Sequence, residues 1–167
     1  PTQTIIFQCL HGVGHAIMYS LVYDLKTSLQ TCDLLADSYQ RSSCYGGVFM
    51  ENVTAFDKTL RDLKKDDPLY PCDSIDDKYK NDCYLMQTSV MYEYGLSDQQ
   101  VADECVKTGM YEAICLTSMG RDLSNYVRTG QTDRVVAACE NISSNPTACI
   151  NGTIYALIDN TWDGSFA

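Results

Sequence analysis

The sequence predicts an all-α protein built from helical hairpins that disulfides hold together. Nine cysteines in 167 residues is a dense supply, and they form two interleaved series whose members stand 32–40 residues apart. A period near 35 residues is typical of helical-hairpin repeats. Apolar residues recur at helical spacing, and the strict alternation that indicates strands is scarce. We therefore expect a single domain over residues 1–167, a disulfide-stapled array of about 4.5 repeats.

The spacing between the two series predicts how the cysteines pair. Each cysteine of one series is followed 10–12 residues later by a cysteine of the other. An unbroken helix of 12 residues would hold the two about 18 Å apart, whereas a disulfide needs Cα atoms within roughly 7 Å. The chain must therefore turn back midway, where turn and cap residues stand. The expected disulfides are Cys32–Cys44, Cys72–Cys83, Cys105–Cys115 and Cys139–Cys149.

The first half of the chain predicts long helices that alternate with short ones. The first long helix covers residues 4–23, and a short helix follows at 28–36. The second long helix begins near Tyr39 and continues to the helix-breaking Asp66-Asp67-Pro68 stretch. Another short helix is expected at 71–75. The first helix carries an apolar stripe with helical spacing, formed by Ile6, Leu10, Val13, Ile17 and Leu21.

The second half continues the alternation with clearer end signals. A long helix at 78–94 ends at Gly95. Ser97 begins a short helix, with Gln100 three residues later as a capping box. The remaining helices are expected at 110–128, stopped by Gly130, then from Thr132, and finally from Pro146, a typical first helical residue, to about 160.

This architecture resembles the Sel1-like and tetratricopeptide classes of helical-hairpin solenoid in its repeat period. It also resembles Sel1-like repeats in having disulfides that link the helices of a hairpin. The resemblance covers the whole chain at the level of architecture. The Trp, Gly, Tyr and Ala signature of tetratricopeptide repeats is missing, and Sel1-like cysteine pairs lie closer together. The resemblance implies a binding scaffold, since such solenoids present a concave surface to a partner.

The composition of the chain indicates which classes of partner and which cellular compartment are favoured. The chain has 22 acidic and 12 basic residues, a net charge of −10, which disfavours nucleic acid and anionic membrane surfaces as partners. No apolar run approaches the ~20 residues of a membrane span. The cysteines lack the CxxC pairs of zinc modules. Three glycosylation sequons, at Asn52, Asn141 and Asn151, agree with an extracellular or cell-surface glycoprotein.

Cys9 is left over when the other eight cysteines pair. By the repeat rule its partner would lie 10–12 residues earlier, just before Pro1. The sequence shows no signal peptide and begins with Pro, so we expect a mature form or a piece of a longer chain. Three interpretations of Cys9 remain open besides a plain free thiol: the chain belongs to a longer repeat array, Cys9 bonds another molecule, or it is a metal ligand.

The two histidines carry the sharpest chemical signal. His11 and His15 stand four residues apart, which places both imidazoles on one helix face, and Met18 follows one turn later. Two histidines with Met18 would suit copper, and two with a carboxylate such as Glu51 would suit zinc. This face lies 100–160° from the apolar stripe, so we expect it to be open to solvent. The alternative is a pair of surface or packing histidines without a ligand.

These observations give a leading functional hypothesis and one alternative. The leading hypothesis is an exported, non-catalytic helical-repeat module for protein binding or extracellular assembly, including head-to-tail or filament assembly. The alternative is a copper- or zinc-binding protein centred on His11 and His15. No Ser-His-Asp or Cys-His catalytic arrangement can be assembled from two histidines on one helix face. A hydrolase that uses a metal bound by His11 and His15 is a minor third hypothesis.

Overall fold

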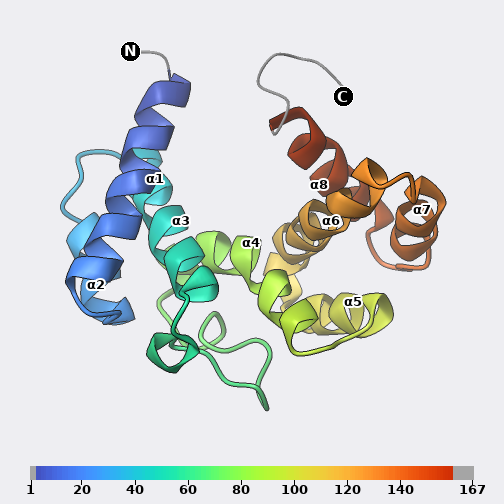
Figure 1. The fold of residues 1–167 in the computed structure, drawn as a ribbon, viewed down its shortest axis with the longest axis horizontal. Helices are drawn as coiled ribbons and strands as arrows, with labels where there is room; N and C mark the ends of the chain where they lie inside the picture. The colour runs from blue at the N-terminus through green and yellow to red at the C-terminus, as the bar shows by residue number, and fades with distance from the viewer. Residues whose placement is uncertain (1–2, 160–167) are drawn as a thin grey trace. The chain divides into compact units, whose positions relative to one another are not determined.

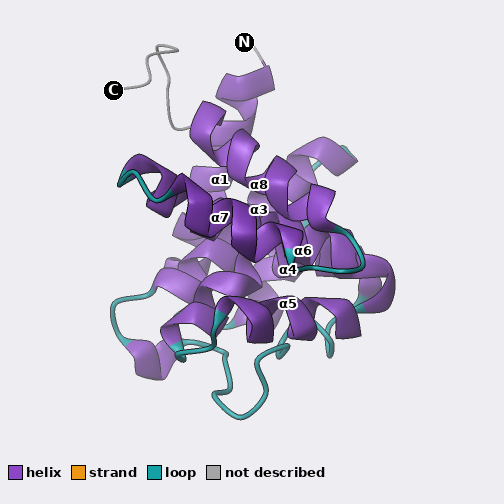
Figure 2. Ribbon diagram, turned by 90° about the vertical axis from the view of Figure 1, so that its right-hand side faces the viewer, coloured by secondary structure: helices purple, strands orange, loops and turns teal. Residues whose placement is uncertain are grey.

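The computed structural model describes residues 3–159, which form eight α-helices, two short 3₁₀-helices and no β-strand (Figures 1 and 2). The chain divides within α4 into two compact units, Pro1–Met86 and Gln87–Ala167. None of the helices in the described range is long and apolar enough to cross a bilayer. The helices are α1 (Gln3–Ser20), α2 (Leu25–Cys32), α3 (Ser38–Thr54), η1 (Lys58–Leu60), α4 (Asp77–Glu93), α5 (Asp98–Lys107), η2 (Gly109–Tyr111), α6 (Glu112–Arg128), α7 (Thr132–Glu140) and α8 (Pro146–Asp159).

In the first unit, α1 packs along α3, and α2 contacts both (Figure 1). The first helix is shorter than expected, because Val22 and Tyr23 adopt left-handed backbone conformations with φ of 55° and 62°. The chain reverses there, and the side chain of Asp24 accepts a hydrogen bond from the backbone N–H of Thr27 to cap α2. A second aspartate, Asp37, caps α3 in the same way. Short polar caps thus set both helix starts.

Two glycines set the crossing of α1 and α3. A Cβ atom on Gly14 would overlap the carbonyl oxygen of Cys44 and lie 2.9 Å from the backbone nitrogen of Val48. A Cβ on Gly47 would overlap the carbonyl oxygen of His11. The helices therefore approach backbone to backbone, which requires glycine at both positions.

The face of α1 that packs against α3 is not the apolar stripe that the sequence predicts. The buried residues of α1 are Gly14 and Met18. None of the expected apolar stripe is fully buried, and Val13 is 42% exposed. Apolar periodicity did not identify the packing face, because the closest contact is made by a residue without a side chain.

The segment between α3 and α4 also departs from the sequence expectation. The second long helix ends at Thr54 instead of continuing to residue 65. The side-chain amide of Asn52 exchanges hydrogen bonds with the backbone N–H and C=O of Asp62, at 2.9 and 3.3 Å. Arg61 donates to the carbonyl oxygen of Ala55. These tertiary contacts fold the chain back, and residues 71–75 form turns instead of the expected short helix.

In the second unit, α6 and α8 cross through glycines in the same way. A Cβ on Gly120 would overlap the Cys149 carbonyl oxygen, and one on Gly152 would overlap that of Thr117. The short helices α5 and α7 pack against α6, and α7 also contacts α8. The capping box between Ser97 and Gln100 is present.

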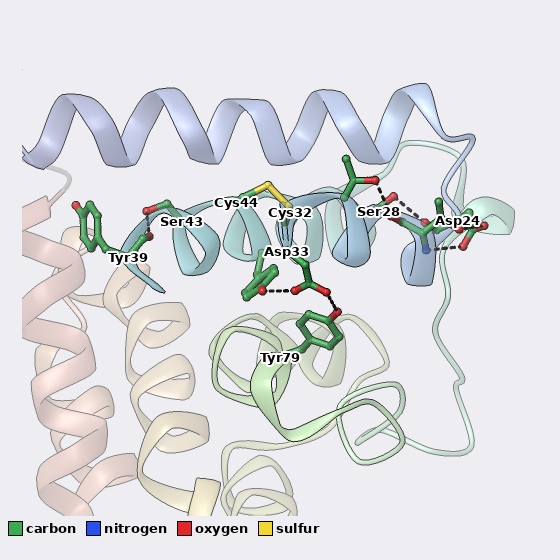
Figure 3. Close-up of a disulfide and its surroundings, with 11 residues drawn as sticks. Asp24, Ser28, Cys32, Asp33, Tyr39, Ser43, Cys44 and Tyr79 are labelled. Atoms are coloured by element: carbon green, nitrogen blue, oxygen red, sulfur yellow. Dashed lines mark hydrogen bonds between the residues drawn. A yellow bond between two sulfur atoms is a disulfide. The ribbon is translucent and has the colours of Figure 1, made fainter. Parts of the chain in front are cut away.

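Four disulfides join the short helices or turns to the long helices that follow them. They are Cys32–Cys44, Cys72–Cys83, Cys105–Cys115 and Cys139–Cys149, with Cα–Cα distances of 5.3–5.7 Å. These are the pairs that the spacing predicts. Figure 3 shows the first of them between α2 and α3. All eight sulfurs belong to buried residues, so each disulfide is part of its unit's core.

Candidate functional site

The histidine face of α1 lies against α3. His11 and His15 are half-buried, and the α3 residues beside them are Met50 and Glu51. The expectation that this face is open to solvent is therefore wrong: the close approach at Gly14 turns it towards α3. The imidazole rings stand 5.0 Å apart, edge to face. The side chain of His15 remains 30% exposed, so the cluster keeps an opening to solvent.

Glu51 is the hub of a hydrogen-bonded chain at this face. One of its oxygens lies 2.8 Å from Nδ1 of His15, and the other accepts a 2.7 Å hydrogen bond from the hydroxyl of Tyr23. Burial alone would raise the pKa of Glu51, but the hydrogen bonds from His15 and Tyr23 outweigh it, and its pKa is lowered. The same bond raises the pKa of Tyr23 to about 12. An ionised Glu51 is an acceptor, so Nδ1 of His15 donates this hydrogen bond, and Nε2 is the ring nitrogen that Glu51 does not engage.

His11 is held on its Nε2 side by Met50. The distance from Nε2 to the Met50 sulfur is 3.5 Å. Burial, and then the neighbouring His15, lower the pKa of His11. The imidazole is therefore biased to its neutral form, which keeps one ring nitrogen available as a lone-pair donor.

The structure brings together some of the predicted ligands and excludes others. Glu51 reaches His15, as the zinc interpretation requires. Met18 is fully buried, and the thioether beside His11 belongs to Met50 instead. In the range 3–159 no three His, Cys, Asp or Glu residues are grouped so as to hold a metal ion. The hydrogen bond from Tyr23 to Glu51 could not be predicted from the sequence, because the turn after α1 brings the Tyr23 hydroxyl to this face.

The remaining predicted sites lie apart from the histidines. Cys9 is an exposed free thiol. It lies roughly 160° around α1 from His11 at 100° per residue, so it cannot join a shared metal shell. Asn141 and Asn151 are exposed and remain predicted glycan acceptors. Asn52 is only 1% exposed and its amide is bound to Asp62, so its sequon is not an available acceptor in the folded chain.

A polar groove of about 510 Å³ lies in the first unit, near the Cys32–Cys44 disulfide. Asp33 accepts hydrogen bonds there from Tyr45, Tyr79 and Lys78 (Figure 3 shows the bond to Tyr79). Burial would raise the pKa of Asp33, but these three donors lower it. The other acid of the groove, Asp82, has its pKa raised to about 6 by burial. Sequence analysis did not single out Asp33, because its partners converge only through the fold.

A second hollow, of about 640 Å³, lies in the second unit. Arg134 stacks 3.6 Å from the ring centre of Tyr126 and pairs with Asp98 at 3.5 Å. Burial raises the pKa of the Tyr92 hydroxyl there. The volume suits a small molecule, but Arg134 and Asp98 already neutralise each other.

Comparisons of the chain with protein-family models, with curated proteins and with solved structures found no match.

Proposed function

We propose that the chain is an exported helical-repeat module that assembles with further copies of itself through the outer face of α1. The observation that carries this proposal is an exposed, uncharged helix face in a strongly acidic chain. The face opposite Gly14 is formed by Ile5, Cys9, Gly12, Val13 and Ala16, all exposed. Ile5 is 52% and Val13 42% exposed. Apolar side chains gathered on a free helix face are typical of an interaction surface.

Charge favours a second copy as the occupant. The chain carries a net charge of −10, so most of its surface repels another copy. None of the 18 residues of α1 is charged. Two copies can therefore bring their α1 faces together without like-charge repulsion. The small side chains of Cys9 and Ala16, with Gly12, permit close approach of the two helices.

The free thiol fits the same contact. In a two-fold symmetric α1–α1 contact, each residue near the axis faces its own copy. Cys9 stands in the middle of the face, so an axis near it would bring two thiols together. Their oxidation forms one S–S bond and passes two protons and two electrons to an oxidant, such as the protein disulfide of an exported thiol oxidoreductase. The four buried disulfides support an oxidising compartment in which such a bond persists.

The outer face of α8 offers a second surface of the same kind. Its exposed residues Ile150, Ile154, Tyr155 and Ile158 are also uncharged. Contacts through both α1 and α8 would extend pairs of chains into a filament, whereas contact through α1 alone closes as a dimer.

The test is the solution mass of the full chain and of two matched valine variants. We expect the parent to be a dimer that a non-reducing gel shows as covalent, and Cys9→Ser to form a weaker, non-covalent dimer. Val13→Glu places a charge on the α1 face and should leave monomers. Val106→Glu is the control, because Val106 is 46% exposed on α5. A parent that stays monomeric, or a Val13→Glu variant that assembles as the control does, would show the proposal to be wrong.

A further inference from the structure

The inner face of α1 holds two metal-donor atoms at the spacing of ligands that share one ion. Nε2 of His11 lies 3.5 Å from the sulfur of Met50. Two ligands with bond lengths of about 2.0 and 2.3 Å and a tetrahedral angle between them are also about 3.5 Å apart. An ion can therefore enter between these atoms without displacing either helix.

His15 offers a third candidate ligand. Histidines four residues apart on one helix face are a known way to hold one metal ion. Glu51 binds Nδ1 of His15, which leaves Nε2 as the lone-pair nitrogen. Metal-bound imidazoles usually donate their other N–H to a carboxylate in this way. Glu51 itself is engaged through both oxygens, by His15 and Tyr23, so it supports the ligand instead of acting as one.

The donor set selects the metal. Soft thioether sulfur with imidazole suits Cu(I), whereas zinc is bound by thiolate, imidazole and carboxylate. Residues 3–159 contain no group of three His, Cys, Asp or Glu residues placed to hold a metal ion, so a zinc site of the usual composition is absent from that range. We propose that the face between α1 and α3 binds one Cu(I) ion through His11, His15 and Met50. This site lies on the opposite side of α1 from the assembly face and does not depend on self-association.

The test is a Cu(I) titration of the full chain in the Cys9→Ser background, which removes the one free thiol of the described residues. Under anaerobic conditions with ascorbate, a chromophoric Cu(I) chelator competes for the ion. We expect one ion per chain and a sulfur neighbour in the X-ray absorption spectrum. Met50→Leu should lose that sulfur and weaken binding more than tenfold, and Glu51→Gln, acting through His15, should weaken it by about tenfold.

Met18→Leu is the matched control, because it exchanges a neighbouring methionine that is fully buried and the exchange conserves volume. It should leave the Cu(I) affinity unchanged. Far-UV circular dichroism and melting curves verify that each variant folds. The proposal is overturned if folded Met50→Leu binds Cu(I) as tightly as Met18→Leu, or if His15→Gln retains the parent's affinity.

Discussion

At the scale of single residues, Asp82 is a carboxyl group whose burial disfavours the ionised form. It lies on α4, half-buried in the groove of the first unit, and accepts a 2.6 Å hydrogen bond from Ser42. Burial raises its pKa to about 6, against an ordinary value near 3.9. The unfolded chain therefore releases this proton at lower pH than the folded chain does. The stability that Asp82 contributes falls between about pH 4 and pH 6 and is constant above.

We predict that Asp82→Asn is more stable than the parent at pH 7. Asparagine cannot ionise, and its carbonyl oxygen can still accept the bond from Ser42. The advantage should be small at pH 4, should grow to on the order of 1–3 kcal/mol by pH 6, and should stay level above that. Urea unfolding at several pH values measures it. Asp66→Asn removes the same charge from an exposed loop position and serves as the control; equal pH profiles for both variants would contradict the prediction.

The candidate site shows how far single residues can be assigned from sequence. Spacing alone placed His11 and His15 on one face. Glu51 was predicted as a zinc ligand, and the structure shows it hydrogen-bonded to His15. Met18 was predicted from the sequence as the sulfur ligand, whereas the structure places the sulfur of Met50 beside His11. Which methionine lies there depends on which face of α1 the glycine crossing turns towards α3, and that is decided by backbone atoms. A residue without a side chain leaves no hydropathy signal.

At the scale of secondary structure elements, each crossing depends on the absence of a Cβ atom at two glycines, one on each helix. We predict that Gly14→Ala destabilises the first unit by about 1–3 kcal/mol or more, because the new methyl group meets backbone on α3 that cannot rotate away. Gly12→Ala, two residues along the same helix, meets nothing within 4 Å. It should stabilise the helix by up to about 1 kcal/mol through helix propensity.

Thermal and urea unfolding compare the two variants in the Cys9→Ser background, at a concentration where the chains are monomeric. Gly152→Ala repeats the experiment in the second unit, where the new Cβ would overlap the Thr117 carbonyl. If Gly14→Ala were as stable as Gly12→Ala, the close approach of α1 and α3 would be wrong.

Helix ends were predictable where local chemistry sets them and unpredictable elsewhere. The capping box at Ser97 involves residues three apart and was found from sequence. The end of α3 at Thr54 depends on Asn52 binding the backbone of Asp62, ten residues away. Apolar residues after Thr54 suggested a longer helix, yet Phe56 is fully exposed in the turn that follows. Long-range contacts overrode local periodicity there.

At the scale of the whole molecule, cysteine spacing was the strongest guide to the fold. Each disulfide closes a loop of 10–12 residues. A link between two cysteines only 10–12 positions apart requires the chain to reverse, which is why spacing alone predicted hairpins. Two disulfides lie in each compact unit, so each unit carries its own covalent constraints.

We predict that reduction of all four disulfides unfolds the chain at 37 °C. Each short loop restricts the unfolded state by about 2–3 kcal/mol. Together the four contribute on the order of 10 kcal/mol, which equals the whole stability of an ordinary domain. Because the cysteines are buried, reduction requires denaturant followed by its removal with the reductant kept present. Far-UV circular dichroism should then show that most of the helix is lost.

Two control variants accompany this experiment. Cys9→Ser, treated identically, excludes thiol exchange through Cys9. Replacement of a single pair by alanines, Cys139→Ala with Cys149→Ala, should lower the free energy of unfolding by only about 2–3 kcal/mol. A reduced chain that kept a cooperative melt near the parent's temperature would mean that packing alone specifies the fold.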